Sequence, residues 1–302
     1  MATKASLGNY RKFIAVFIAI SVLASITYTD GAVNDKCHEN CECDDLSVSC
    51  IRGKVPLGTK EDGFGTFFDG ALTQMHIDNS ESETSRADKT RLEPLTQDAL
   101  PYENVKDLTL NGVYIETIAD NAFELLVGLT HLNLDNNMIV TLSAKSFFGL
   151  RQLQTLSINN NKLNTIPGGA FEPLVSIVNL HLQGNLIDTI QAGAFPKKPL
   201  IETLDISKNP EMRTIPTAVD ALTGLDKLVA RDCKINELRD NWKAKFPGII
   251  EVDLTNNLIP EIKKSHFEGL DQLRKVGVGV GNHCLKYQHS AVKIYISALG
   301  WD

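Results

Sequence analysis

The chain has 302 residues, of which 43% are hydrophobic and 22% are charged, and its formal net charge at neutral pH is −7. This length is enough for two ordinary domains or for one long repetitive domain. The acidic balance argues against nucleic acids and heparin-like polymers as partners, because such ligands need basic surface patches.

Residues 1–32 have the pattern of an export signal. Arg11 and Lys12 precede an apolar run at 13–26, and small residues follow it. This run is shorter than the ~20 residues that a spanning helix needs. We therefore expect a cleaved signal peptide over 1–32 and a secreted protein, with a type II membrane anchor as the alternative interpretation. No second apolar run of that length follows, so no stable membrane insertion is expected.

Four cysteines lie close together within residues 33–71. Their spacing is C-x3-C-x-C-x6-C, formed by Cys37, Cys41, Cys43 and Cys50. Such a cluster either binds zinc, with His38 as an additional ligand, or forms disulfides. The oxidising compartment that an exported protein enters favours disulfides. Four cysteines allow three pairings, and spacing alone does not choose among them.

From about residue 72 the chain repeats itself every 24 residues. The stretches HLNLDNNMIVTL, TLSINNNKLNTI and NLHLQGNLIDTI align at Leu132, Leu156 and Leu180. Other copies have their first apolar anchor at Leu108, Leu204, Leu228, Val252 and Val276. A first copy at Met75 fits only if an insertion follows it, and we assign that insertion to the polar residues 79–91. A fixed period of this size predicts a solenoid.

A second column of residues supports the same register. Its members, again 24 residues apart, are Phe123, Phe147, Phe171, Phe195 and Val219. Phe267 returns two periods after Val219, and the missing member falls at Lys243. Either Trp242 or Phe246 could fill the space there. Two columns in phase indicate stacked units that share one continuous core.

These copies resemble the leucine-rich repeat pattern L-x-x-L-x-L-x-x-N-x-L, in its typical 24-residue extracellular class. The segments NAFELL and GAFEPL resemble the convex segment of that class. The resemblance implies an α/β solenoid, a horseshoe with a parallel concave β-sheet and a mostly irregular convex side, with about nine repeats over 72–282. It also implies that 33–71 form a cysteine-rich N-terminal cap, with bridges Cys37–Cys43 and Cys41–Cys50.

One Asn recurs at a fixed place inside each apolar pattern. Buried turns leave backbone groups that must be paired, and an Asn side chain both donates and accepts hydrogen bonds. We therefore expect a structural ladder formed by Asn137, Asn161, Asn185, Asn209, Cys233 and Asn257. We interpret Cys233 as a small buried side chain rather than a reactive thiol. The adjacent Asn160 is expected to point outward and to tolerate replacement by Ala.

Function is expected on the concave sheet, because the chain contains no catalytic or metal-binding motif. Alternation along each strand predicts which side chains point outward. An apolar residue, an Arg and charges of both signs converge over 203–255, and we expect a protein partner to bind there through Asp205, Lys227, Val229, Arg231, Glu251 and Asp253. Arg231 is the expected anchor. The alternative is that Lys227 and Arg231 only balance the neighbouring carboxylates.

The C-terminal segment 283–302 departs from the family pattern. It has only Cys284 where a cysteine-rich cap is usual. We expect a C-terminal cap without a disulfide cluster. Cys284 is then either buried or bonded to another chain.

The combined interpretation is a secreted, non-enzymatic protein that works by protein–protein recognition, with no catalytic residues, no metal and no cofactor. The resemblance also allows two alternatives. One is an accessory, non-catalytic subunit that stabilises a secreted enzyme such as a luciferase, which would make the chain part of a hetero-oligomer. The other is an extracellular-matrix or innate-immune recognition protein.

Overall fold

A computed structural model of the chain describes residues 41–43, 47–51, 73–78, 95, 104–278 and 293–295. The predicted signal peptide 1–32, the insertion 79–91 and Cys284 lie outside the described residues. Among the described residues, no helix is both long and apolar enough to cross a membrane.

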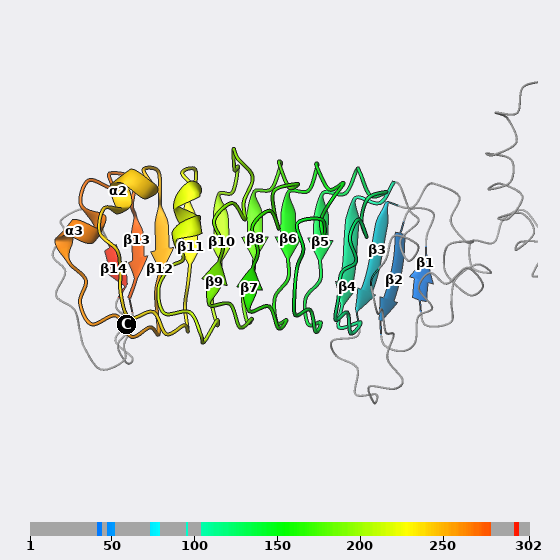
Figure 1. Ribbon diagram of the computed structural model, residues 1–302, viewed down its shortest axis with the longest axis horizontal. Helices are drawn as coiled ribbons and strands as arrows, with labels where there is room; N and C mark the ends of the chain where they lie inside the picture. Colours follow the sequence, from blue (N-terminus) through cyan, green and yellow to red (C-terminus); the bar gives the residue numbers. More distant parts are fainter. Residues whose placement is uncertain are drawn as a thin grey trace, which may run out of the picture.

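The described strands lie side by side along the length of the molecule (Figure 1). One long sheet contains, in order, β1 (Cys41–Cys43), β2 (Ser47–Ile51), β3 (Gln74–Asp78), β4 (Asp107–Asn111), β5 (His131–Asn133), β6 (Thr155–Ser157), β8 (Asn179–His181), β10 (Thr203–Asp205), β11 (Lys227–Val229), β12 (Glu251–Asp253), β13 (Lys275–Gly277) and β14 (Lys293–Tyr295). All its pairings are parallel except β1–β2. β7 (Thr165–Ile166) and β9 (Thr189–Ile190) form a separate two-stranded sheet.

The pairing register is the 24-residue register predicted from the sequence. Leu156 pairs with Leu132 on one side and with Leu180 on the other, and all three side chains are buried. Met75 pairs with Leu108, so the longer first copy changes the connecting segment and leaves the strand register intact. At its N-terminal end the sheet also continues two strands beyond the first repeat, because β2 pairs with β3 through Val48 and Met75, and β1 pairs with β2.

The Phe column forms a continuous stack inside the solenoid. Phe123, Phe147, Phe171 and Phe195 have successive ring centroids 6.1, 6.0 and 5.9 Å apart. Such pairs contribute about 0.5–1.5 kcal/mol each beyond the burial of their area. At the gap predicted at Lys243, both candidate side chains are buried. The Trp242 ring meets Phe246 and Phe267 edge-on at 5.4 and 5.1 Å.

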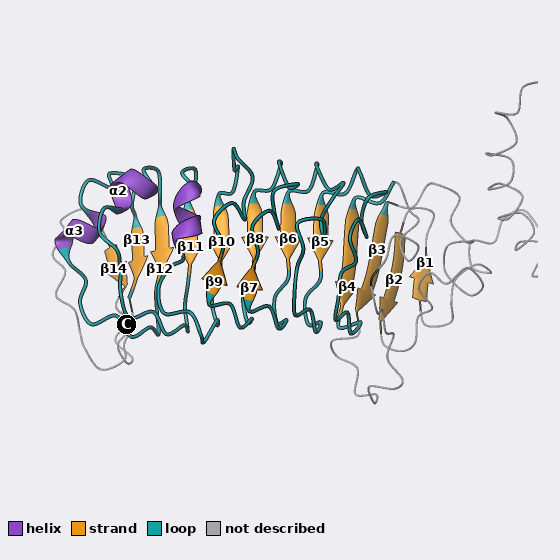
Figure 2. Cartoon of the chain, viewed as in Figure 1, coloured by secondary structure: helices purple, strands orange, loops and turns teal. Residues whose placement is uncertain are grey.

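The side away from the long sheet changes character along the chain. It consists mostly of loops and turns in the N-terminal repeats, whereas helical turns appear towards the C-terminal end (Figure 2). These turns are η5 (Thr217–Ala221), α2 (Trp242–Lys245) and α3 (Lys264–Phe267). The fold is thus the predicted leucine-rich repeat solenoid, with a parallel sheet on one side and a mostly irregular second side.

The two ends of the sheet fall within the predicted caps. Cys41 of β1 lies opposite Cys50 of β2, and the Cys50 sulfur is disulfide-bonded. Cys37 lies outside the described residues, so the two bridges Cys37–Cys43 and Cys41–Cys50 stay predictions. At the other end, β14 lies inside the predicted cap 283–302 and extends the sheet beyond β13.

Candidate partner-binding surface

The Asn side chains predicted to form a ladder lie buried in the turns that follow the long-sheet strands. The N–H of Ile139 donates to Asn161 Oδ1 at 3.0 Å, and Asn161 Nδ2 donates to the Leu134 carbonyl at 2.9 Å. Both partners belong to the preceding repeat. The same pattern of bonds occurs at Asn137, Asn185, Asn209 and Asn257. Each side chain thereby joins its own turn to the turn before it.

Cys233 takes the same place and donates to the equivalent two carbonyls, although with a thiol in place of an amide. Its thiol lies 3.4 Å from the carbonyl oxygens of Ile206 and Arg231, to which it donates. The preceding turn is one residue longer, since its buried apolar residue is Met212, three positions after Asn209 instead of two. The Met212 N–H already donates to the Asn209 carbonyl at 3.0 Å. A side chain without an amide oxygen is therefore sufficient in this turn.

The chemistry of Cys233 agrees with a structural role. Burial raises the pKa of its thiol to about 11. The thiolate is the nucleophilic form of cysteine, so this residue stays an unreactive thiol at neutral pH.

A second column, which sequence reasoning missed, precedes the ladder by one residue. Its members have left-handed backbone with φ between +53° and +70°, and they are Asn136, Asn160, Gly184, Lys208, Asp232 and Asn256. Asn and Gly adopt this conformation at the lowest cost. The signal in the sequence was the Asn or Gly that comes directly before several ladder residues.

Asn160 is exposed, as predicted, but it is not a neutral surface position. Its Nδ2 donates to Asn136 Oδ1 at 3.0 Å, and its backbone has a φ of +54°. At the next member, Gly184, an added Cβ would lie 2.3 Å from Asn160 Oδ1, so the Asn160 side chain would have to move to admit it. The structure gives a physical reason to expect the opposite of tolerance at Asn160, since Ala adopts this backbone only under strain, and the effect of Ala there stays a prediction.

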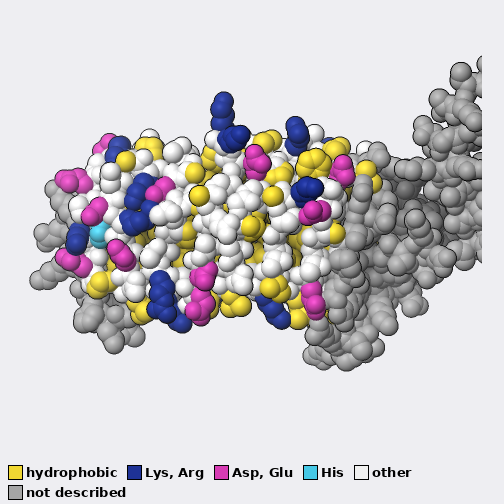
Figure 3. Space-filling view, viewed as in Figure 1, with side chains coloured by type: hydrophobic (Ala, Val, Ile, Leu, Met, Phe, Trp, Pro, Cys, Tyr) yellow, Lys and Arg dark blue, Asp and Glu magenta, His cyan; other side chains and the backbone are white. Residues whose placement is uncertain are grey.

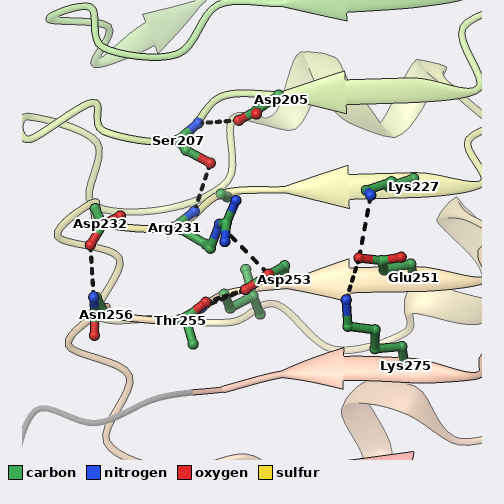
Figure 4. Close-up of polar contacts among 12 residues, drawn as sticks. Asp205, Ser207, Lys227, Arg231, Asp232, Glu251, Asp253, Thr255, Asn256 and Lys275 are labelled. Carbon is green, nitrogen blue, oxygen red and sulfur yellow. Dashed lines mark hydrogen bonds and ion pairs between the residues drawn. The ribbon is translucent and has the colours of Figure 1, made fainter. Parts of the chain in front are cut away.

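On the long sheet, two lysines from different strands share one carboxylate (Figure 4). The Nζ atoms of Lys227 and Lys275 lie 3.4 and 2.9 Å from Glu251 Oε1. Burial raises the pKa of Glu251, but the hydrogen bond from Lys275 and the charge of Lys227 outweigh it, so this pKa lies below its ordinary value. The hydrogen bond to Glu251 raises the pKa of Lys275. Sequence reasoning left Lys275 out of the site, although it is the Cα partner of Glu251 in the 24-residue register.

Arg231 lies next to this group and is paired with Asp253. Arg231 Nε is 3.6 Å from Asp253 Oδ2, and the two side chains are 50% and 13% exposed. The other oxygen, Asp253 Oδ1, accepts hydrogen bonds from the backbone N–H and the hydroxyl of Thr255. A Cβ added to Gly277 would lie 2.7 Å from that oxygen. The glycine therefore leaves the space in which the Asp253 carboxylate lies.

Val229 does not offer the exposed apolar contact that the sequence predicted. Its position on the outward side of β11 is as expected, but only 5% of its surface is exposed. The side chains of Lys227 and Arg231, two residues to either side, are longer and reach towards the carboxylates of β12 (Figure 4). The accessible part of this surface is therefore polar.

The predicted partner-binding residues thus fall into two sets. Four of them lie together as two ion pairs, Lys227 with Glu251 and Arg231 with Asp253. The pairing of β11 with β12 places these two ion pairs side by side. Asp205 bonds within its own turn, where its Oδ1 accepts from the Ser207 N–H at 2.9 Å. Ser207 connects the two sets, because its hydroxyl accepts from the Arg231 N–H at 3.1 Å.

The rest of the sheet surface is less charged near its middle. The outward positions of β6 and β8 hold Thr155, Ser157, Asn179 and His181. Towards the N-terminal end His131 Nδ1 lies 2.8 Å from Asp107 Oδ1, and the imidazole is well exposed. On the face of the molecule shown in Figure 3, charged side chains occur in small mixed groups and hydrophobic atoms in separate patches. That mixture is typical of an ordinary solvated surface.

Comparison with known proteins agrees with this architecture. A family model described as "Leucine rich repeat" matches residues 103–163 and 129–187. A search of curated proteins gave no match to the chain. The crystal structure of the leucine-rich repeat domain of APL1B is 21% identical, with a TM-score of 0.53 over 71% of this chain and 69% of that one.

A second solved structure, the crystal structure of a TLR13–ssRNA13 complex, is 18% identical with a TM-score of 0.50. The match covers 76% of this chain and only 28% of the other chain. At these identities the similarities show a shared fold. The chain therefore has the leucine-rich repeat fold, while its own ligand has to be inferred from its surface.

Proposed function

We propose that this chain is a secreted, non-enzymatic recognition protein that binds a protein partner on its long sheet, over β10–β13, with Arg231 as the anchor. The observation that carries the proposal is the arrangement around β12. Three exposed cationic side chains lie beside two carboxylates that are largely covered and hydrogen-bonded in place. Arg is enriched among the residues that dominate binding energy at protein interfaces.

The fold supports this use of the surface. Stacked repeats present a broad, continuous sheet whose side chains are fixed relative to one another by the register. A side chain that is already held by an ion pair loses less rotational freedom when a partner binds. Arg231 meets this condition because Asp253 holds its Nε, and Thr255 holds Asp253.

The N-terminal sequence supports export as part of this proposal. Residues 1–32 have the pattern of a signal peptide, and a cysteine cluster follows them. Disulfides persist in the oxidising compartments that exported proteins enter. The disulfide at Cys50, with Cys41 across the β1–β2 pair, is consistent with that compartment.

The proposal is tested with the full-length protein purified from the fluid into which it is exported. A photo-crosslinking residue is placed at Lys227, and a matched one at Thr189, which is exposed on the separate two-stranded sheet. We expect one protein chain to crosslink in stoichiometric yield at Lys227 and not at Thr189. If the captured chain is an enzyme, the accessory-subunit form of the proposal is supported. Equal crosslinking at both positions, or none at Lys227, would contradict a partner on the long sheet.

A further inference from the structure

The exposed side chains of the surface around β12 are mainly cationic. Lys227 and Lys275 are each 43% exposed and Arg231 is 50% exposed, whereas Glu251 is only 23% exposed. We call Lys227, Arg231 and Lys275 the cationic cluster. Because the carboxylates are less exposed than the cations, a partner approaching this surface meets the cations first.

Arg231 keeps donors that its ion pair does not use. Its contact with Asp253 is made through Nε, and no other side-chain partner of Arg231 is found among the described residues. The two Nη groups are the part of a guanidinium that forms a parallel pair of hydrogen bonds with a carboxylate. Arg231 is thus oriented by one carboxylate and remains able to bind a second one.

The two covered carboxylates act as positioning groups for the cations. Glu251 Oε1 holds both lysine Nζ atoms, and Asp253 holds Arg231. Asp253 is held in turn by a hydrogen bond from the Thr255 N–H, and the missing side chain at Gly277 leaves room for its carboxylate. Asp205, on the neighbouring strand, makes no ion pair with Arg231 within the part of the chain that the structure describes, and its Oδ1 accepts from Ser207.

We propose that the cationic cluster binds an acidic segment of the partner protein. One carboxylate of that segment pairs with the Nη groups of Arg231, and another lies between Lys227 and Lys275. This inference deepens the proposed function and rests on it. A short acidic peptide fits better than a nucleic acid, because a few carboxylates are enough to meet the three cations, whereas a longer polyanion would extend over the rest of a chain with a net charge of −7.

The first test uses a fluorescein-labelled peptide of ten glutamates, with a peptide of ten serines as the uncharged control, measured by fluorescence anisotropy. We expect the glutamate peptide alone to bind the wild-type protein, more weakly as salt is added. Arg231→Ala should weaken this binding by about tenfold or more, a typical loss for a desolvated interface anchor. Lys234→Ala is the matched control, since Lys234 is also about half exposed and ion-paired, but outside the cluster. It should leave the affinity unchanged.

A second set of variants separates charge from geometry. Glu251→Gln frees both lysines and should tighten binding of the glutamate peptide by about threefold, a modest gain appropriate to exposed pairs. Gly277→Ala leaves the charge unchanged but pushes the Asp253 carboxylate away, so it should weaken binding about threefold while the circular dichroism spectrum stays as in wild type. Arg231→Lys keeps the charge without the planar fork and should recover only part of the affinity.

The proposal is overturned if the glutamate peptide does not bind, if Arg231→Ala binds it as tightly as wild type does, or if a ten-nucleotide deoxythymidine strand binds more tightly with the same dependence on Arg231. Failure of the proposed function would look different. A partner that crosslinks at Lys227, but whose binding responds neither to salt nor to Glu251→Gln, upholds recognition by the long sheet and rejects the acidic segment. If the glutamate peptide binds but no partner crosslinks at Lys227, the affinity of the cationic cluster for acidic chains is upheld and recognition of a partner by the long sheet is rejected.

Discussion

Between residues 104 and 200 the repeats are nearly uniform, whereas between 201 and 278 the strand register continues but several other periodic features are modified. In the first region the Phe rings stack without interruption. In the second, Val219 replaces Phe, Cys233 replaces the ladder Asn, and helical turns replace loops. The cationic cluster lies in this second region. The comparison indicates that regular repeats build the scaffold and that altered repeats carry the surface that distinguishes this protein.

The largest expected effect lies in the Phe stack. Phe147→Ala removes a ring buried between two others and should lower the free energy of unfolding by about 3–5 kcal/mol. Val219→Ala, at the equivalent place in the altered region, should cost about 2 kcal/mol because only two carbons are lost. Urea unfolding followed by circular dichroism measures both. Similar losses at the two positions would contradict the larger contribution assigned to the stacked rings.

The ladder offers a second comparison between the regions. Asn161→Ala leaves the Ile139 N–H and the Leu134 carbonyl without their buried partner and should cost about 1–3 kcal/mol. Cys233→Ala should cost less than about 1 kcal/mol, because a thiol is a weak donor and the Met212 N–H is bonded within its own turn. The same unfolding measurement applies. A loss at Cys233 as large as that at Asn161 would contradict the role assigned to the longer turn.

A smaller effect is expected in the left-handed column. Asn160→Ala keeps a backbone φ of +54° but removes the amide side chain that makes this left-handed conformation tolerable, so it should cost about 1–2 kcal/mol. Asn160→Gly should be close to neutral, since glycine adopts this backbone freely and loses only the bond to Asn136. The thermal unfolding midpoints of the two variants distinguish strain from the lost hydrogen bond. If Gly is as damaging as Ala, the hydrogen bond and not the backbone conformation is what matters.

The smallest expected effect is a pH dependence confined to the altered region. Burial lowers the pKa of His266, and the charge of Asp240 opposes this shift only in part. The unfolded state therefore binds more protons than the folded state, so stability is fully present above an unfolded pKa of about 6.5 and falls as the pH drops towards the folded value. Removing this group with His266→Gln should flatten the fall in unfolding free energy between pH 7 and pH 5. An unchanged slope would exclude His266 as its source.

The scaffold could be predicted from the sequence because its signals are periodic and local. Leu156 and Phe147 each occupy a column that recurs every 24 residues, and Asn161 has a polar side chain where only a buried turn explains it. These features depend on position within one repeat. The register that they define also placed Arg231 and Asp253 in neighbouring repeats.

The rest of the candidate site depends on contacts between repeats, which a single copy does not show. Val229 is only 5% exposed in the assembled sheet, and the sequence pattern records only its outward direction. Lys275 enters the cluster through Glu251, a repeat away. The space for Asp253 depends on the absence of a side chain at Gly277. Such features follow from three-dimensional neighbours and were accessible only once the strands were placed together.

The most direct test of partner recognition by the altered region compares two sheet positions in one binding assay. With the crosslinked partner purified, its dissociation constant is measured for the wild type, for Arg231→Ala and for Asn133→Ala, which lies on β5 four repeats before β11. We expect a loss of at least about 2 kcal/mol for Arg231→Ala, roughly 30-fold, and almost no change for Asn133→Ala. An Arg231→Ala protein that is folded and secreted normally, yet binds the partner as tightly as the wild type, would contradict partner recognition by the altered region.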